Sequence, residues 1–212
     1  MKYQTANDQY LIAMRKGQKE VRALTLAGKD PNPPVLDKLP GMDSSLSVQE
    51  LGYMDIPADR LIGTKTAGRM SAFSPSFLPT LSARSEFGMT WIMLCEAHLS
   101  DEGIRDPIQC YEYLGNFYVQ EGNKRVSVLK FFDAPRIPAY VKRVLPAPSD
   151  DPRVKAYYEF LEFYQAAKLY TVQFRRPGDY AKLLTHLGKK PGEEWSQQEQ
   201  RTFNSYFHYF EE

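Results

Sequence analysis

The sequence predicts an α+β fold, with a small mixed sheet, helices packed on that sheet and a mainly helical C-terminal extension. Two observations favour this class. Strand and helix signals alternate between residues 50 and 146, and apolar residues recur at helical spacing from 151 to 210. The 212 residues suit one domain with extensions, and the 14 Tyr and 12 Phe predict a largely aromatic core.

Residues 1–49 are expected to form a helix and a proline-rich arm. Tyr10, Met14 and Val21 recur on one side of a helix predicted over 7–27, which Gly28 ends in a left-handed conformation. Four prolines then interrupt the segment that follows, up to residue 49. This segment is interpreted as a linker or as an extended arm that lies on the domain.

Residues 50–146 are predicted to form the mixed-sheet domain. We expect strands at 51–56, 108–113, 117–120 and 137–145, helices at 85–99 and 123–132, and a basic loop at 63–69. The side chains expected to be buried by the two helices are Trp91, Leu94, Val128, Leu129 and Phe132.

The segment 147–212 is predicted to be a helical extension that packs on this domain rather than a separate domain. A capping residue followed by proline at 151–152 favours a helix start, and a capping box at 196–199 opens the last helix. Between these helices we expect a short strand at 170–174 and a further helix at 180–187.

Bulk properties exclude several classes of protein. The formal net charge of +1 argues against a general attraction to nucleic acid or acidic membranes, so an anion site must be a local cluster. Cys95 and Cys110 form no CxxC pair and the three histidines are far apart in sequence, so no metal site is expected. No signal peptide and no run of about 18 apolar residues is recognised, which predicts a cytoplasmic protein with no membrane partner. The apolar pattern that still continues at Phe210 predicts a longer natural chain.

A strand-to-helix turn is the clearest candidate site. The residues Glu121-Gly122-Asn123-Lys124-Arg125 join an apolar strand directly to an amphipathic helix. Free N–H groups and the positive end of the helix dipole then point at one place, which favours anion binding. Gly122 lets a phosphate approach the backbone, and Lys124 and Arg125 add positive charge. The alternative is a surface turn with solvated basic residues.

The order of motifs around this turn resembles that of the ParB/sulfiredoxin superfamily over residues 50–146. The matching parts are the strand at 54–57, the basic loop 63–69, the helix 85–99, the segment 103–108, the turn 122–125 and the Ile-Pro pair at 137–138. The resemblance implies that a nucleotide, with Mg²⁺ if it is a nucleoside triphosphate, or another phosphate-bearing ligand binds at the turn. It places Gly122, Asn123, Lys124 and Arg125 at the phosphates, Lys65, Thr66 and Arg69 on the opposing wall, and Glu102 and Arg105 beside them.

The chain also departs from the family pattern. Asn123 stands where sulfiredoxin has its catalytic cysteine and where ParB proteins usually have an acidic residue, so sulfinic acid reduction is not expected. No helix-turn-helix is recognised in 150–212, so chromosome partitioning is not implied. Glu121 is a weak catalytic candidate that could bind a metal or act as a base; otherwise it is an exposed carboxylate at a strand end.

Our leading hypothesis is a regulatory module that binds a nucleotide or another phosphate-bearing ligand, with weak or no hydrolysis. The alternative is a nucleic-acid-binding or protein-interaction module that has lost the nucleotide site. Six basic residues against one acid from Lys124 to Arg143, and the aromatic C-terminal helices, favour this alternative. An enzyme that uses Glu121 ranks last. The partners expected besides the ligand are a protein or further domain and weakly bound nucleic acid.

Overall fold

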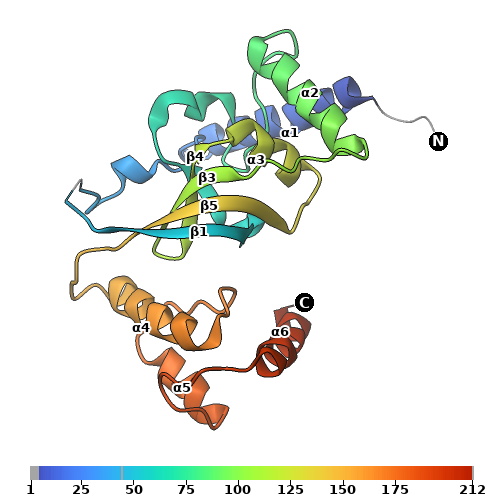
Figure 1. Ribbon diagram of the computed structural model, residues 1–212. Helices are drawn as coiled ribbons and strands as arrows, with labels where there is room; N and C mark the ends of the chain where they lie inside the picture. Colours follow the sequence, from blue (N-terminus) through green and yellow to red (C-terminus); the bar gives the residue numbers. More distant parts are fainter. Residues whose placement is uncertain (1–4, 44, 212) are drawn as a thin grey trace. The chain divides into compact units, whose positions relative to one another are not determined.

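The computed structural model describes residues 5–43 and 45–211 (Figure 1). The chain divides into two compact units, unit 1 (Met1–Leu145) and unit 2 (Pro146–Glu212). Helices account for 45% and strands for 19% of the structure, which confirms the predicted α+β class. That the C-terminal extension packs on the sheet domain stays a prediction.

A five-stranded mixed sheet forms the centre of unit 1, in the order β1-β5-β3-β4-β2. Its strands are β1 (Val48–Pro57), β2 (Leu61–Thr64), β3 (Ile108–Tyr113), β4 (Asn116–Glu121) and β5 (Arg136–Val144). The pairs β1–β5 and β3–β4 are antiparallel, and the pairs β3–β5 and β2–β4 are parallel. This order places the end of β4, and with it the candidate turn, one strand in from the β2 edge.

Three helices of unit 1 pack against one another. They are α1 (Ala6–Leu26), α2 (Glu86–Leu99) and α3 (Asn123–Phe131), with α2 in contact with both others (Figure 1). The fully buried rings of Tyr10 and Trp91 meet edge to face, with 5.2 Å between their centroids. The indole Nε1 of Trp91 donates a hydrogen bond to Ser127 Oγ at 2.9 Å. This aromatic core therefore fixes the position of α3, at whose amino end the candidate turn lies.

The burial pattern confirms most of the predicted helix core. The buried members are Trp91, Val128 and Leu129, and the partly buried ones are Leu94 and Phe132. His98 packs against Phe132 with 4.7 Å between ring centroids, and burial lowers the pKa of its imidazole. This histidine is therefore a packing residue.

The proline-rich segment packs on the sheet of unit 1, as expected for an extended arm rather than a linker. Val35 forms a parallel bridge to Thr64, and Leu36 is only 1% exposed. The prediction of a loop from Gly63 onward is wrong at its start, because Gly63 and Thr64 belong to β2. This strand has four residues and pairs in parallel with β4, so a tertiary contact rather than a local pattern makes it a strand.

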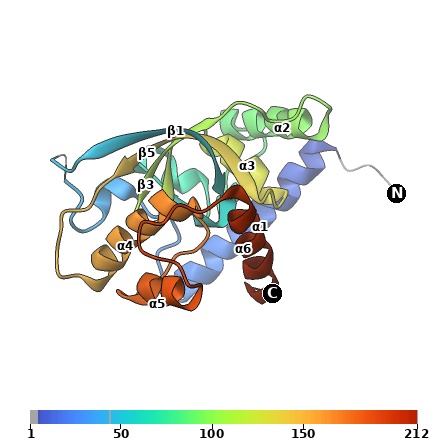
Figure 2. The ribbon, with the colours of Figure 1, turned by 60° about the horizontal axis from the view of Figure 1, so that its bottom comes forward.

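The described residues of unit 2 form three helices. Figure 2 shows them from a second side. They are α4 (Pro152–Ala167), α5 (Asp179–His186) and α6 (Gln197–Glu211). The predicted helix starts are confirmed. The carboxylate of Asp151 accepts a hydrogen bond from Arg153 N at 2.8 Å, and Ser196 and Glu199 each accept from the other's backbone N–H.

The strand predicted at 170–174 is wrong, because this segment has no strand partner in the described residues. The hydroxyl of Tyr180 accepts a hydrogen bond from Phe174 N at 3.1 Å and donates one to Val172 O at 2.9 Å. A side chain thus satisfies backbone groups that a neighbouring strand would otherwise bond. The rings of Tyr170 and Phe174 contact those of Phe160 and Tyr180, and Val172 is fully buried.

The thiol of Cys110 should make the stability of unit 1 depend on alkaline pH. This side chain of β3 is 1% exposed, and burial raises its pKa from 9.0 to about 12. Above pH 9 the unfolded thiol loses its proton while the folded one keeps it, so stability falls as pH rises from about 9 to 12. Between pH 8 and 10 the wild type should lose about 1.4 kcal/mol more than Cys110→Ala, measured by urea unfolding. Equal losses would show that the folded thiol titrates normally.

Candidate functional site

The turn between β4 and α3 has the geometry that anion binding requires. Gly122 adopts φ 101° and ψ 20°, in the left-handed region, and α3 begins directly after it without a side-chain cap. A Cβ atom at this position would lie 2.7 Å from Ile108 Cγ2, so only glycine fits. The first N–H groups of α3 have no partner within the helix, and the positive end of its dipole lies at the same place.

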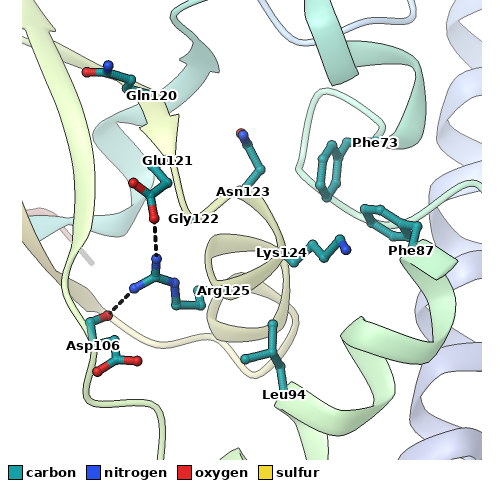
Figure 3. Close-up of a pocket in the computed structure, with 10 residues that line it drawn as sticks. All are labelled: Phe73, Phe87, Leu94, Asp106, Gln120, Glu121, Gly122, Asn123, Lys124 and Arg125. Atoms are coloured by element: carbon teal, nitrogen blue, oxygen red, sulfur yellow. Dashed lines mark hydrogen bonds and ion pairs between the residues drawn. The ribbon is translucent and has the colours of Figure 1, made fainter.

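The turn opens onto a pocket of about 540 Å³, within the usual range for small-molecule sites (Figure 3). We call it the turn pocket. Its lining comprises Gln120, Glu121, Gly122, Asn123, Lys124 and Arg125 from the turn, Asp106 before β3, and Phe73, Phe87 and Leu94. The uncapped helix end thus faces a hollow with an apolar wall.

Arg125 contributes to the fold of the turn. Its Nη1 donates a hydrogen bond to the carbonyl oxygen of Asp106, at 3.0 Å, and its Nη2 lies 3.5 Å from Glu121 Oε1 (Figure 3). The same Nη1 also donates to Pro107 O at 2.8 Å. These contacts tie α3 to the loop before β3. The guanidinium is therefore needed for the local structure, contrary to the interpretation that treats it only as a phosphate ligand.

Lys124 is better placed to receive an anion. Its side chain lines the turn pocket and its Nζ lies 5.4 Å from the centre of the Phe87 ring. The nearest acid is Glu86, whose Oε1 is 3.8 Å away and whose side chain is 87% exposed. The Lys124 side chain is only 16% exposed, but water screens the exposed carboxylate of Glu86, so the ammonium can exchange this weak ion pair for a bound anion at small cost.

Asn123 and Glu121 complete the polar wall of the turn pocket. The Oδ1 atom of Asn123 is buried and has no hydrogen-bond partner among the described residues. An unpartnered buried polar atom is unfavourable, and a ligand that donates a hydrogen bond would remove this cost. The exposed carboxylate of Glu121 accepts a hydrogen bond from Gln109 Nε2 at 3.2 Å and pairs with Arg125. These contacts agree with the strand-end interpretation of Glu121.

None of the described side chains of the basic loop lines the turn pocket. Lys65 lies 3.1 Å from Asp37 and lines a different pocket, of about 410 Å³, and Thr66 is exposed. The apolar wall consists instead of Phe73 and Phe87. Phe87 lies on the helix predicted at 85–99, but helical spacing does not show which neighbour a side chain faces.

The remaining predicted residues lie outside the turn pocket or outside the described side chains. Glu102 and Arg105 are exposed, and Arg105 Nη2 donates to Asp101 O at 3.3 Å. Their neighbour Asp106, which sequence reasoning missed, lines the pocket. The side chain of Arg69 lies outside the described part of the chain.

Most of the basic side chains in the segment 124–143 form hydrogen bonds or ion pairs within unit 1. Lys130 Nζ donates to Leu61 O at 2.6 Å, and burial lowers its pKa to about 8. Arg143 forms a buried ion pair with Glu112. The other contacts are Lys142 with Glu50 at 2.8 Å and Arg136 with Asp55 O at 3.4 Å. This segment therefore does not form a continuous basic surface, which removes one reason for a nucleic-acid interface here.

Comparison with known proteins finds no matching family model, no similar curated protein and no similar solved structure. Among the described residues, no three His, Cys, Asp or Glu side chains form a group that could hold a metal ion. Nor does that part of the chain contain a helix long and apolar enough to cross a membrane.

Proposed function

We propose that unit 1 is a ParB/sulfiredoxin-like module that binds a nucleotide or another phosphate-bearing ligand in the turn pocket and thereby regulates a partner. The observation that carries the proposal is the uncapped amino end of α3, which faces a pocket that also contains Lys124. Backbone N–H groups, a helix dipole and an ammonium together form a site for phosphate oxygens. The rings of Phe73 and Phe87 supply an apolar wall for the rest of the ligand.

Two carboxylates could bind the magnesium ion that is expected to accompany a nucleoside triphosphate. Asp106 and Glu121 line the turn pocket, and carboxylate and phosphate oxygens are the ligands that Mg²⁺ prefers. When bound with a triphosphate, the ion would neutralise part of the phosphate charge. In this proposal the two carboxylates orient the ion and its phosphates.

Weak or no hydrolysis is part of the proposal. The amide of Asn123 is a poor acid or base, and the carboxylate of Glu121 is exposed and paired with Arg125. A binding and switching role therefore fits the turn better than catalysis.

A thermal-shift screen tests the proposal against CTP, ATP, ADP, GTP and pyrophosphate, each with and without Mg²⁺. A ligand present at 100 times its Kd should stabilise the protein by about 2.7 kcal/mol. Stabilisation by at least one of these compounds is expected. If none of them raises the Tm, the phosphate assignment of the turn pocket is wrong.

The variant Lys124→Gln should lose about tenfold in affinity for the compound that the screen selects. A charge-assisted hydrogen bond contributes about 1.5–3 kcal/mol, and about 1.4 kcal/mol corresponds to a tenfold change in Kd. Its Tm without ligand should fall only slightly, because the substitution removes an ion pair screened by water and the contact of the ammonium with the Phe87 ring. The control Glu86→Gln releases Lys124 from that pair and should bind at least as tightly. Calorimetry that finds equal affinity for Lys124→Gln and wild type would contradict the role of this lysine.

A further inference from the structure

The exposed side of α1 carries a row of basic side chains. Arg15, Lys19 and Arg22 are all exposed and stand at positions i, i+4 and i+7, so they form one stripe along the helix. We call them the α1 basic stripe. In the segment 15–29 the sequence has five Lys or Arg residues against the single acid Glu20.

The α1 basic stripe keeps its charge available. No ion pair joins any of its three side chains to an acid among the described residues. The carboxylate of Glu20 accepts a hydrogen bond from Ser76 Oγ at 2.8 Å. The segment 124–143 differs, because acids and carbonyl oxygens of unit 1 hold most of its basic groups.

Packing fixes which side of α1 faces outward. Tyr10, Ala13 and Gly17 are buried, and a Cβ atom on Gly17 would lie 2.5 Å from Pro79 O. The backbone of α1 therefore touches unit 1 closely, and the helix cannot roll to bury its charged side. The stripe is a fixed feature of the surface of unit 1.

We propose that the α1 basic stripe binds the phosphate backbone of nucleic acid without reading its sequence. At a rise of about 1.5 Å per residue, the stripe extends about 10.5 Å along the helix axis. Each strand of duplex DNA carries one negative charge per about 3.4 Å of its axis, so a row of this length matches about three phosphates of one strand. This charge complementarity identifies the partner as a dense polyanion.

An acidic membrane fits the stripe less well. Helices that dock on membranes insert a face of large apolar side chains. The apolar side of α1 is packed into the core of unit 1 through residues such as Tyr10 and Met14. Leu26, which is 90% exposed, is the large apolar side chain that α1 presents to solvent. A stripe that binds through charge alone therefore favours nucleic acid.

The test measures anisotropy of a labelled 20-base-pair DNA duplex against salt concentration. A triple variant, Arg15→Gln with Lys19→Gln and Arg22→Gln, should bind at least tenfold more weakly at 50 mM salt. Its slope of log K against log salt should be less steep by about 2.7, for three phosphate contacts. The control is a triple variant of unit 2, Arg153→Gln with Lys155→Gln and Lys182→Gln. It removes the same amount of charge from exposed positions and should bind as the wild type does. The double variant Arg15→Lys with Arg22→Lys keeps the charge and should also bind normally.

Three results would overturn the proposal. They are absence of wild-type binding at 25 mM salt, equal loss of affinity in the stripe variant and the unit 2 control, and binding to phosphatidylserine vesicles without binding to DNA. Circular dichroism should show the same helix content in all variants, because the substituted side chains are exposed. Nucleotide-induced thermal shifts should be unchanged in the stripe variant, so this test and that of the turn pocket are independent.

Discussion

Replacing Glu112 by Gln should lower the free energy of unfolding by about 3–5 kcal/mol, measured by urea denaturation at pH 7. The carboxylate is fully buried and lies against the guanidinium of Arg143, whose side chain is 7% exposed. It also accepts a hydrogen bond from Gly115 N, at 2.7 Å, in the β3–β4 turn. Removing the negative charge takes away the carboxylate that pairs with this buried cation, which is costlier than losing both partners together.

The control for this prediction is the ion pair made by Lys142, the residue before Arg143 in β5, with Glu50 of β1. Lys142 and Glu50 lie 2.8 Å apart, but their side chains are 41% and 71% exposed. Because water and salt screen this pair, Glu50→Gln should cost less than about 1 kcal/mol. Similar losses in Glu112→Gln and Glu50→Gln would show that the buried pair does not stabilise unit 1.

The variant Gly122→Ala should lose about 3 kcal/mol of stability and should no longer respond to nucleotides in the thermal-shift screen. Two costs add at this position. A side chain at φ 101° is strained by about 1–3 kcal/mol, and its Cβ atom would lie 2.7 Å from Ile108 Cγ2. The turn must then shift, which moves the first N–H groups of α3 away from the turn pocket.

Gly103→Ala separates strain from crowding. Gly103 has φ 66°, also left-handed, but a Cβ atom there would meet nothing within 4 Å. We expect a loss of about 1 kcal/mol and an unchanged response to nucleotides. If Gly122→Ala is no more destabilising than Gly103→Ala, the close contact with Ile108 does not determine this turn.

Signals that act within one helical turn were predictable from the sequence. Gly28 ends α1 with φ 67°, and the Lys29 N–H bonds back to Leu24 O at 2.9 Å, as expected for a glycine that stops a helix. The capping residues of α4 and the turn at Gly122 follow the same logic. The partner groups of the caps are a few residues apart, and the left-handed backbone of Gly122 is a local property, although the contact of this glycine with Ile108 is not.

Contacts between distant segments were not predictable. The position of Arg125 in the sequence predicts a phosphate ligand, yet its guanidinium donates hydrogen bonds to the carbonyl oxygens of Asp106 and Pro107. The resemblance predicts that Lys65 belongs to the same site, yet its ammonium forms an ion pair with Asp37 of the proline-rich arm. Both side chains are long and flexible, so the acceptor they reach depends on how the arm, loop and sheet come together.

The sequence by itself determined where the helices begin and end, the glycine turn before α3 and the α+β class, because capping, backbone angles and periodicity are local properties. Only the tertiary structure decided which basic side chains stay available for a ligand. Folding buries or pairs Lys130 and Arg143, whereas it leaves the α1 basic stripe exposed. Burial and pairing join residues far apart in the chain, so a local excess of charge in the sequence does not identify a charged surface.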